Sequence, residues 1–216
     1  MAYLVKLGYN MMAGAQFTLG LFAVTIVFSL PLGMRLALVR TGREPVTRGL
    51  TGIYVWIMRG TPLLLQLFFI YFGLPQIPVI GPYMTMARFP AACLTFVLNY
   101  AAYFCEIFRG GILSVGKGQY EAAQVLGFGK WQTTLKIVLP QMLRVSLPAI
   151  SNECITLVKD TALITAIGVT EILYFAKTAV NRDVNASAYA VAAVIYLVMT
   201  YGLTKLFKWL ERKFQY

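Results

Sequence analysis

The sequence predicts an all-α, polytopic membrane protein that crosses the bilayer five times. Of its 216 residues, 59% are hydrophobic and only 12% are charged, which is more apolar surface than a soluble domain of this length can bury. The apolar residues gather in runs of about 20, the length that an α-helix needs to span a bilayer. Lys and Arg cluster at the ends of these runs, so the net charge of +11 does not indicate a nucleic-acid-binding face.

Five spans can be read from the hydropathy of the chain. They cover approximately Gln16–Leu38, Ile53–Leu74, Phe89–Phe108, Val145–Ile167 and Ala188–Leu206. The first apolar run is too long for the core of a cleavable signal peptide and no basic segment precedes it, so we expect it to remain as a signal anchor.

The distribution of cations predicts the orientation of the spans. Three segments are rich in Lys and Arg, namely the linker after the first span, the linker after the third span and the C-terminal tail. Their cations are Arg40, Arg43, Arg48, Arg109, Lys117, Lys130, Lys136, Arg144, Lys205, Lys208, Arg212 and Lys213. Because cytoplasmic segments carry the excess of positive charge, we expect the N-terminus outside and the C-terminus in the cytoplasm.

The linker between the third and fourth spans has the pattern of a short helix that ends in a turn. Polar and small residues with high helix propensity alternate there, and two glycines follow in the manner of C-cap and turn residues. These residues are Gln119, Glu121, Ala122, Ala123, Gln124 and Leu126, then Gly127 and Gly129. Beyond the turn, Trp131, Leu135 and Val138 recur at helical spacing, and Pro140 and Pro148 are expected to interrupt the chain as it approaches the fourth span.

The same linker resembles a known family. Residues 118–141 read GQYEAAQVLGFGKWQTTLKIVLPQ, which is similar to the EAA motif of permease subunits in ATP-binding cassette (ABC) importers. Residues 59–75 (RGTPLLLQLFFIYFGLP), 101–112 (AAYFCEIFRGGI) and 152–164 (NECITLVKDTALI) resemble the polar amino acid branch, of histidine, glutamate, glutamine and arginine type.

The resemblance implies a type I ABC importer permease fold, with residues 1–216 as a single transmembrane domain. It also implies a cytoplasmic coupling helix, within about residues 116–130, that docks on the ATPase. The docking residues would be Gln119, Glu121, Ala122, Ala123 and Gly127. The implied partners are two ATPase subunits, a second identical or related permease subunit and an extracytoplasmic amino-acid-binding protein, assembled at a bacterial cell membrane and working by alternating access.

Catalytic chemistry is not encoded in any recognisable motif. The chain has no GxxxxGK[ST] phosphate-binding loop and no His, so we expect ATP to be hydrolysed by another chain. Cys93, Cys105 and Cys154 lie in apolar stretches without CxxC spacing, which favours packed small hydrophobes over a metal site or a disulfide, and no cofactor is expected. A passive channel or an ion-coupled secondary transporter also fits the hydropathy, but neither accounts for a docking helix.

Polar residues within the spans suggest a path for a zwitterionic substrate. Asn99, Tyr103 and Glu106 share one helical face, and Asn152 and Glu153 lie within the fourth span. We expect these five residues to bind substrate; the two acids, without a fixed cation nearby, lean slightly toward a basic amino acid. Internal pairing is an alternative, with Glu106 bound to Arg109, and with Lys159 and Asp160 bound to each other or to other partners.

Overall fold

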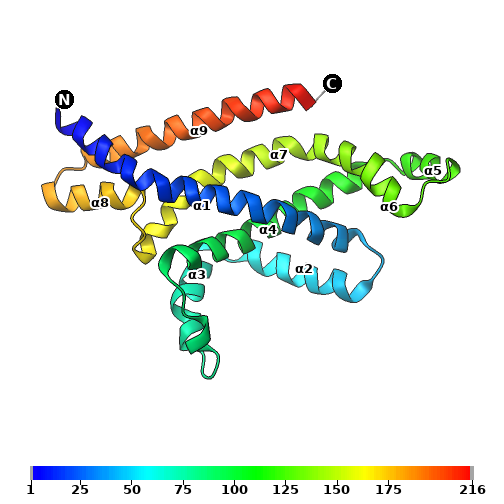
Figure 1. Cartoon of the computed structure of the whole chain (residues 1–216), viewed down its shortest axis with the longest axis horizontal. Coiled ribbons are helices and arrows are strands. Elements are labelled where there is room, and N and C mark those ends of the chain that lie inside the picture. The colour runs from blue at the N-terminus through cyan, green and yellow to red at the C-terminus, as the bar shows by residue number, and fades with distance from the viewer. Residues whose placement is uncertain (1, 215–216) are drawn as a thin grey trace.

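The structure, a computed structural model, describes residues 2–214, and every regular element in that range is a helix. In Figure 1, α1 (Ala2–Thr41), α7 (Leu139–Asp160) and α9 (Ser187–Phe214) run along the longest axis of the molecule. The 40 residues of α1 extend about 60 Å at a rise of 1.5 Å per residue. The prediction of an all-α chain is confirmed for the described residues.

The core is built mainly where α1 packs against α4 (Arg88–Ser114). Phe96, Tyr100 and Phe104 of α4 are almost completely buried. Gly33 of α1 lies so close to α4 that a Cβ atom there would be 2.7 Å from the Cβ of Phe104. A glycine is therefore required at this point for the two backbones to approach.

The second predicted span is a broken helix in the structure. Glu44 caps α2 (Pro45–Gly60) by accepting hydrogen bonds from the backbone N–H groups of Thr47 and Val46. The Thr47 side chain, together with these two backbone bonds, holds the pKa of the Glu44 carboxyl below its usual range. After α2 the chain bends by 105° into α3 (Leu63–Phe68). Pro62 at the break cannot supply a backbone N–H to continue the helix.

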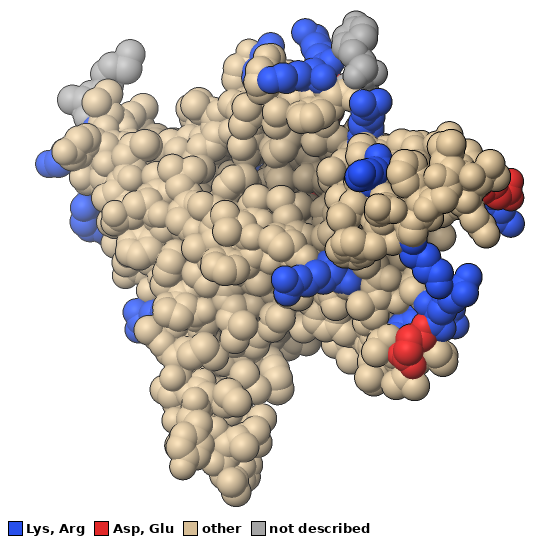
Figure 2. Space-filling view, turned by 45° about the vertical axis from the view of Figure 1, so that its right-hand side comes forward, with Lys and Arg blue, Asp and Glu red and all other residues tan. Residues whose placement is uncertain are grey.

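Beyond the bend, the chain forms an arm that projects away from the long helices (Figure 1). The arm comprises α3, the short π-helix η1 (Phe69–Gly73) and the short 3-10 helices η2 (Leu74–Gln76) and η3 (Gly81–Met84). A single turn of π-helix of this kind is called a π-turn below. Residues 63–87 include no charged side chain. In Figure 2 this arm is the uncharged lower part of the molecule, whereas most of the visible Lys and Arg lie on the right and at the top.

The α4–α7 connection (residues 115–138) lies at one end of the long helices (Figure 1). It contains α5 (Lys117–Val125), α6 (Lys130–Thr133) and the π-turn η4 (Thr134–Val138), which continues directly into α7. The expected interruption at Pro148 is wrong, because α7 continues through that residue. Near Pro140 the regular α-helix is interrupted, since the π-turn η4 ends at Val138 and α7 begins at Leu139. Pro140 lies at the start of α7, directly after the π-turn, where the hydrogen-bond register already changes and a missing N–H is tolerated.

The C-terminal third packs on the first half of α1. After α7, the 3-10 helix η5 (Thr161–Ile167) ends at Gly168, whose φ of 76° turns the chain into α8 (Ile172–Asp183). A Cβ on Gly14 of α1 would be 2.5 Å from the backbone of Glu171 at the start of α8. The side chain of Glu171 is fully buried and accepts hydrogen bonds from Thr165, Tyr196 and the backbone of Tyr174.

Three stretches, Tyr3–Thr41, α4 and α9, are individually long and apolar enough to cross a membrane. Two bent helix pairs, Pro45–Gly60 with Leu63–Gln76 and Lys130–Ile167 with Ile172–Asp183, pass the same test together. The described residues thus provide three to five membrane-crossing elements.

Candidate functional site

The expected helix in the α4–α7 connection is present as α5. Its C-terminus is closed by two backbone hydrogen bonds, from Gly127 to Gln124 (3.0 Å) and from Phe128 to Ala123 (2.9 Å). This pair of bonds is the Schellman pattern, which needs a residue in the left-handed conformation, and Gly127 has a φ of 76°. The predicted helix and glycine turn are therefore confirmed.

The residues expected to dock differ in their exposure. Gln119, Glu121, Ala122 and Gly127 are exposed to solvent. Ala123 is only 1% exposed and faces its own chain, so its small side chain allows α5 to pack internally rather than to meet a partner in this structure. Gln119 accepts a hydrogen bond from Gln141 of α7 at 3.3 Å, which links α5 to the long helix.

Apolar residues beside the expected docking set are also exposed. Val125, Leu126 and Trp131 are 87%, 73% and 66% exposed, although the segment around them is polar. Adjacent exposed apolar side chains on a polar segment are typical of a protein interaction surface. None of these three residues was among the expected docking residues, because in the sequence their hydrophobicity cannot be distinguished from that of core residues.

Glu106 lies in a cluster of three arginines. Arg109 donates two hydrogen bonds to its Oε2 atom, at 2.7 and 3.0 Å, and a guanidinium nitrogen of Arg40 lies 3.0 Å from Oε1. A nitrogen of Arg59 is 4.0 Å from Oε2. The expectation that Glu106 has no fixed cation nearby is therefore wrong, because Arg40 and Arg59 approach from α1 and α2, far away in sequence. The pairing with Arg109, considered as an alternative, is present.

Asn99 is buried at the bend between α2 and α3. Its side-chain amide donates to the carbonyl of Met58 and to the side chain of Gln66, both at 3.0 Å. Gln66 in turn donates to Met58 and Thr61. These bonds satisfy backbone carbonyls that the 105° break releases from regular helix pairing, so in this structure Asn99 stabilises the bend.

Tyr103 borders a cavity of about 440 Å³ between α2 and α4. The guanidinium of Arg59 lies 5.3 Å from the centre of its ring, which is the geometry of a cation–π contact. Glu106 and Arg40 also line this cavity. Its charged wall is therefore mainly cationic, with the two guanidinium groups of Arg40 and Arg59 beside one carboxylate.

Asn152 and Glu153 remain available for a ligand. Asn152 is exposed and Glu153 is half-buried on α7. Neither side chain forms a hydrogen bond or an ion pair within residues 2–214. The five expected substrate residues thus separate into Asn99 at the bend, Tyr103 and Glu106 at the arginine cluster, and the unpaired Asn152 and Glu153.

Lys159 and Asp160 do not pair with each other in the described part of the chain. Asp160 accepts a hydrogen bond from the hydroxyl of Tyr100 at 2.7 Å, whereas Lys159 is exposed. Successive residues of a helix point about 100° apart, which turns the lysine away from its neighbour.

Residues 2–214 contain no group of three or more His, Cys, Asp or Glu side chains that could hold a metal ion. The three cysteines are free thiols.

Comparison with known proteins identifies the class of protein. Residues 29–216 match the family model described as "Binding-protein-dependent transport system inner membrane component". The chain belongs to this family of multi-pass membrane proteins, the permease subunits of ABC importers.

The chain is similar along most of its length to individual permease proteins of bacterial transport systems. The L-cystine transport system permease protein TcyB of Bacillus subtilis is 38% identical over 202 residues, which cover 93% of this chain and 84% of the relative. The glutamine transport system permease protein GlnP of Escherichia coli is 33% identical over 201 residues, with 93% and 90% covered.

A solved structure described as an amino acid ABC transporter with histidines superposes with a TM-score of 0.88. It is 30% identical in sequence, and the match covers 98% of this chain and 97% of the other. The fold is therefore the type I ABC permease fold, and the chain is a permease subunit of an ABC importer. A passive channel or an ion-coupled secondary transporter is not supported by these relatives.

Proposed function

We propose that this chain carries a polar amino acid across the bacterial cell membrane, driven by ATP hydrolysis in a separate subunit. Support comes from relatives named for transport of L-cystine, octopine and glutamine. The observation that carries the proposal in the structure is α5 with its glycine turn, whose exposed polar and apolar residues form a surface that the chain itself leaves uncovered.

In the proposed orientation the chain spans the membrane five times, with each bent helix pair as one span. The N-terminus is outside, and α5 and the C-terminus are in the cytoplasm. The positions of Lys and Arg around the α1–α2 connection, the α4–α7 connection and the end of α9 support this orientation.

The proposed ATPase-docking surface combines Gln119, Glu121, Ala122 and Gly127 with the neighbouring exposed residues Val125 and Leu126. A partner that covers the apolar pair would remove it from water, and each such side chain contributes roughly 1.5–3 kcal/mol when fully buried. Since α6, η4 and α7 form one continuous helical path, movement of this surface is transmitted to the membrane-embedded part. Alternating access follows when the ATPase closes and opens.

The proposed substrate contacts are centred on Asn152 and Glu153. The carboxylate of Glu153 is suited to bind an ammonium group, and the amide of Asn152 can both donate and accept hydrogen bonds. Glu106 is compensated by arginines, so one free acid remains where two were expected. The argument for a basic amino acid is correspondingly weaker, and the proposal names a polar amino acid without a fixed charge class.

The partners in this proposal are two ATPase subunits, a second permease subunit and an extracytoplasmic binding protein for the amino acid. The decisive experiment is to purify the chain from its native membrane under mild solubilisation. The assembly is then tested for ATP hydrolysis in the presence of its binding protein and each amino acid in turn. We expect an ATPase subunit to co-purify and one group of amino acids to stimulate hydrolysis. Purification without an ATPase would contradict the proposal.

A further inference from the structure

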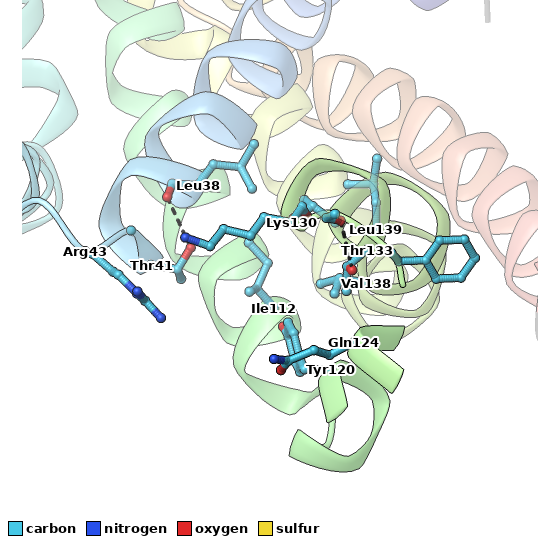
Figure 3. Close-up of a pocket in the computed structure, with 14 residues that line it drawn as sticks. Leu38, Thr41, Arg43, Ile112, Tyr120, Gln124, Lys130, Thr133, Val138 and Leu139 are labelled. Atoms are coloured by element: carbon cyan, nitrogen blue, oxygen red, sulfur yellow. Dashed lines mark hydrogen bonds between the residues drawn. The ribbon is translucent and has the colours of Figure 1, made fainter. Parts of the chain in front are cut away.

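A cavity among the described residues lies between the end of α1 and the α4–α7 connection, and neither of the exposed apolar residues of α5, Val125 and Leu126, lines it. Its volume is about 890 Å³, within the range of roughly 300–1,000 Å³ that is common for ligand sites. Figure 3 shows Leu38, Thr41 and Arg43 on one side and Lys130, Thr133 and Val138 on the other. The proposed substrate and docking residues are not among those that line it.

The lining of this cavity has two chemically distinct parts. The apolar side chains of the lining are buried or half-buried and form its inner part, whereas the two cations and Tyr120 are exposed and form its outer part. The apolar residues are Leu38, Ile112, Val138 and Leu139, and the polar group includes Arg43, Lys130, Thr41 and Tyr120. None of the lining residues is acidic, so Arg43 and Lys130 have no internal carboxylate to neutralise them in the cavity.

The position of the cavity along the helices also bears on the kind of ligand that fits it. It lies where α1 ends at Thr41 and where the chain leaves the end of α4, which is the level at which apolar spans give way to charged connections. In Figure 3 the Lys130 side chain extends from the α4–α7 connection toward Thr41. The π-turn η4 forms part of the wall, and π-turns within helices are frequent at functional sites.

We propose that this cavity binds an anionic phospholipid of the cytoplasmic leaflet. Arg43 and Lys130 hold the phosphate, and the apolar inner part covers the glycerol backbone and the first methylene groups. The proposal rests on the cytoplasmic orientation given under the proposed function. Basic pockets between helices on the cytoplasmic side are suited to anionic headgroups, because both the surface charge and the apolar tails favour that position.

A soluble phosphate compound can interact with only the cationic part of this lining. It can pair with Arg43 and Lys130, but it leaves Leu38 and Leu139 in contact with water. An amphiphile removes that apolar surface from water while keeping its charge at the rim. The site also connects α1 to the segment that carries α5, so a bound lipid stabilises the position of the ATPase-docking surface.

The test uses the purified permease–ATPase assembly and native mass spectrometry. Phosphatidylglycerol and phosphatidylcholine with identical acyl chains are titrated separately. We expect preferential binding of phosphatidylglycerol, weakened about 30-fold in the double variant Arg43→Gln/Lys130→Gln, from about five-fold per charge near a membrane surface. The charge-preserving variant Arg43→Lys/Lys130→Arg should retain binding.

A matched control removes the same charges elsewhere. Arg48 and Lys208 are exposed and do not line the cavity, so Arg48→Gln/Lys208→Gln should bind phosphatidylglycerol as the unaltered protein does. Equal binding of the two lipids, or unchanged phosphatidylglycerol binding in Arg43→Gln/Lys130→Gln, overturns the proposal. Competition by glycerol 3-phosphate as effective as that by phosphatidylglycerol assigns the cavity to a soluble anion instead.

Two further outcomes separate this inference from the proposed function. If Arg43→Gln/Lys130→Gln binds phosphatidylglycerol normally but loses the ATPase subunit on purification, the two cations belong to the ATPase contact and the lipid site is wrong. If the assembly hydrolyses ATP in response to an amino acid yet shows no preference for phosphatidylglycerol, only the lipid site fails. Both proposals assume that the α4–α7 connection is cytoplasmic, and thiol labelling of single cysteines tests this orientation independently.

Discussion

Glu106 and Glu153 are both acids within apolar helices, yet their surroundings give them different roles. Glu106 is held by Arg40 and Arg109, whereas Glu153 has no partner in the described residues. A carboxylate already bonded to guanidinium groups is less available to a substrate ammonium, because binding requires those bonds to be broken. Glu106 therefore fits a structural role, and Glu153 is the better candidate for ligand contact.

Replacement of Glu106 should affect stability more than substrate affinity. In Glu106→Gln, Arg40 and Arg109 lose their common anion, and hydrogen bonds to charged groups contribute roughly 1.5–3 kcal/mol. We expect a lower thermal unfolding temperature for the purified subunit. Glu211→Gln provides the control, because Glu211 forms no ion pair within residues 2–214 and its replacement should leave the unfolding temperature unchanged. An unchanged unfolding temperature in Glu106→Gln would rule out the structural role.

Replacement of Glu153 should show the opposite pattern. Glu153→Gln removes a charge that has no internal partner, so the fold loses no ion pair. We expect the concentration of amino acid that gives half-maximal ATPase stimulation to rise several-fold, while the unfolding temperature and the co-purification of the ATPase stay constant. Stimulation curves that superimpose on those of the unaltered protein would remove Glu153 from the substrate site.

The turn at Gly127 offers a test that depends on backbone conformation alone. A Cβ at this position would meet no atom within 4 Å, but the φ of 76° is unfavourable for any residue with a side chain, by roughly 1–2 kcal/mol. Gly127→Ala should loosen the end of α5 and reduce transport per ATP hydrolysed in reconstituted vesicles. Gly129→Ala is the control, since Gly129 has an ordinary φ of −68° and a Cβ there would make only an ordinary contact, 3.8 Å from Oε1 of Gln132. Equal coupling in both variants would refute the requirement for the turn.

Among the helices, the contact between α1 and α4 shows how a single position controls the distance between two elements. At Gly33 an added methyl group would lie 2.7 Å from Phe104 Cβ and 3.0 Å from the carbonyl oxygen of Ala101. Both atoms belong to the backbone or are fixed to it, so the strain cannot be relieved by rotation of a side chain. The two helices would have to move apart, which would open the core around Phe104.

We therefore expect Gly33→Ala to lower stability by roughly 1–3 kcal/mol, as overpacking of a core does. The measurement is the midpoint of thermal unfolding in detergent, together with the yield of folded subunit. Gly20→Ala serves as the control on the same helix, because a Cβ there would be an ordinary 3.5 Å from the flexible end of Phe89. If the two variants unfold at the same temperature, the α1–α4 contact at Gly33 does not limit helix approach.

The broken second span and the continuous path from α6 into α7 have complementary mechanical consequences. At the bend between α2 and α3, Asn99 and Gln66 bond to the interrupted backbone and fix the direction of the arm. By contrast, η4 joins the α4–α7 connection to α7 without a gap. The bend between α2 and α3 directs an apolar arm away from the long helices. The π-turn η4, by contrast, keeps the docking surface rigidly attached to α7.

At the scale of the whole molecule, large apolar surfaces remain exposed. Only 6% of the most apolar 18-residue stretch of α9 is buried. Its residues Leu197, Val198 and Tyr201 are each about two-thirds exposed. In the arm, Phe69, Phe72 and Val79 are 56%, 49% and 85% exposed, and the arm itself has no charged side chain. Surfaces of this kind require lipid or another apolar protein surface to cover them, in agreement with a membrane subunit that functions in an assembly.

The orientation of the whole molecule can be tested with single cysteines. Val184 is 92% exposed in the turn between α8 and α9, at the opposite end of α9 from Lys213. We expect Val184→Cys to react with a membrane-impermeant maleimide in sealed cells or spheroplasts, and Lys213→Cys to react only after permeabilisation. The unaltered protein, whose three thiols are largely buried, gives the background. Reaction in the reverse order would invert the proposed topology.

The sequence by itself determined the features that depend on local pattern. Runs of apolar residues predicted the membrane-crossing segments. The alternation of polar and small residues before Gly127 predicted α5 and its turn, because helix propensity and the left-handed conformation of glycine depend on residues that are close in sequence. The sequence also located Asn152 and Glu153 as polar residues within a span. Their role as substrate contacts remains a prediction.

The tertiary structure alone decided which distant residues meet. Arg40 and Arg59 reach Glu106 from helices about 50 or more residues away in the chain, and Asn99 reaches across 41 residues to the carbonyl of Met58. The burial of Ala123 likewise depends on contacts with residues outside α5. A hydropathy pattern records how apolar a residue's neighbours in sequence are, but charge compensation and burial depend on neighbours in space, which only the folded chain defines.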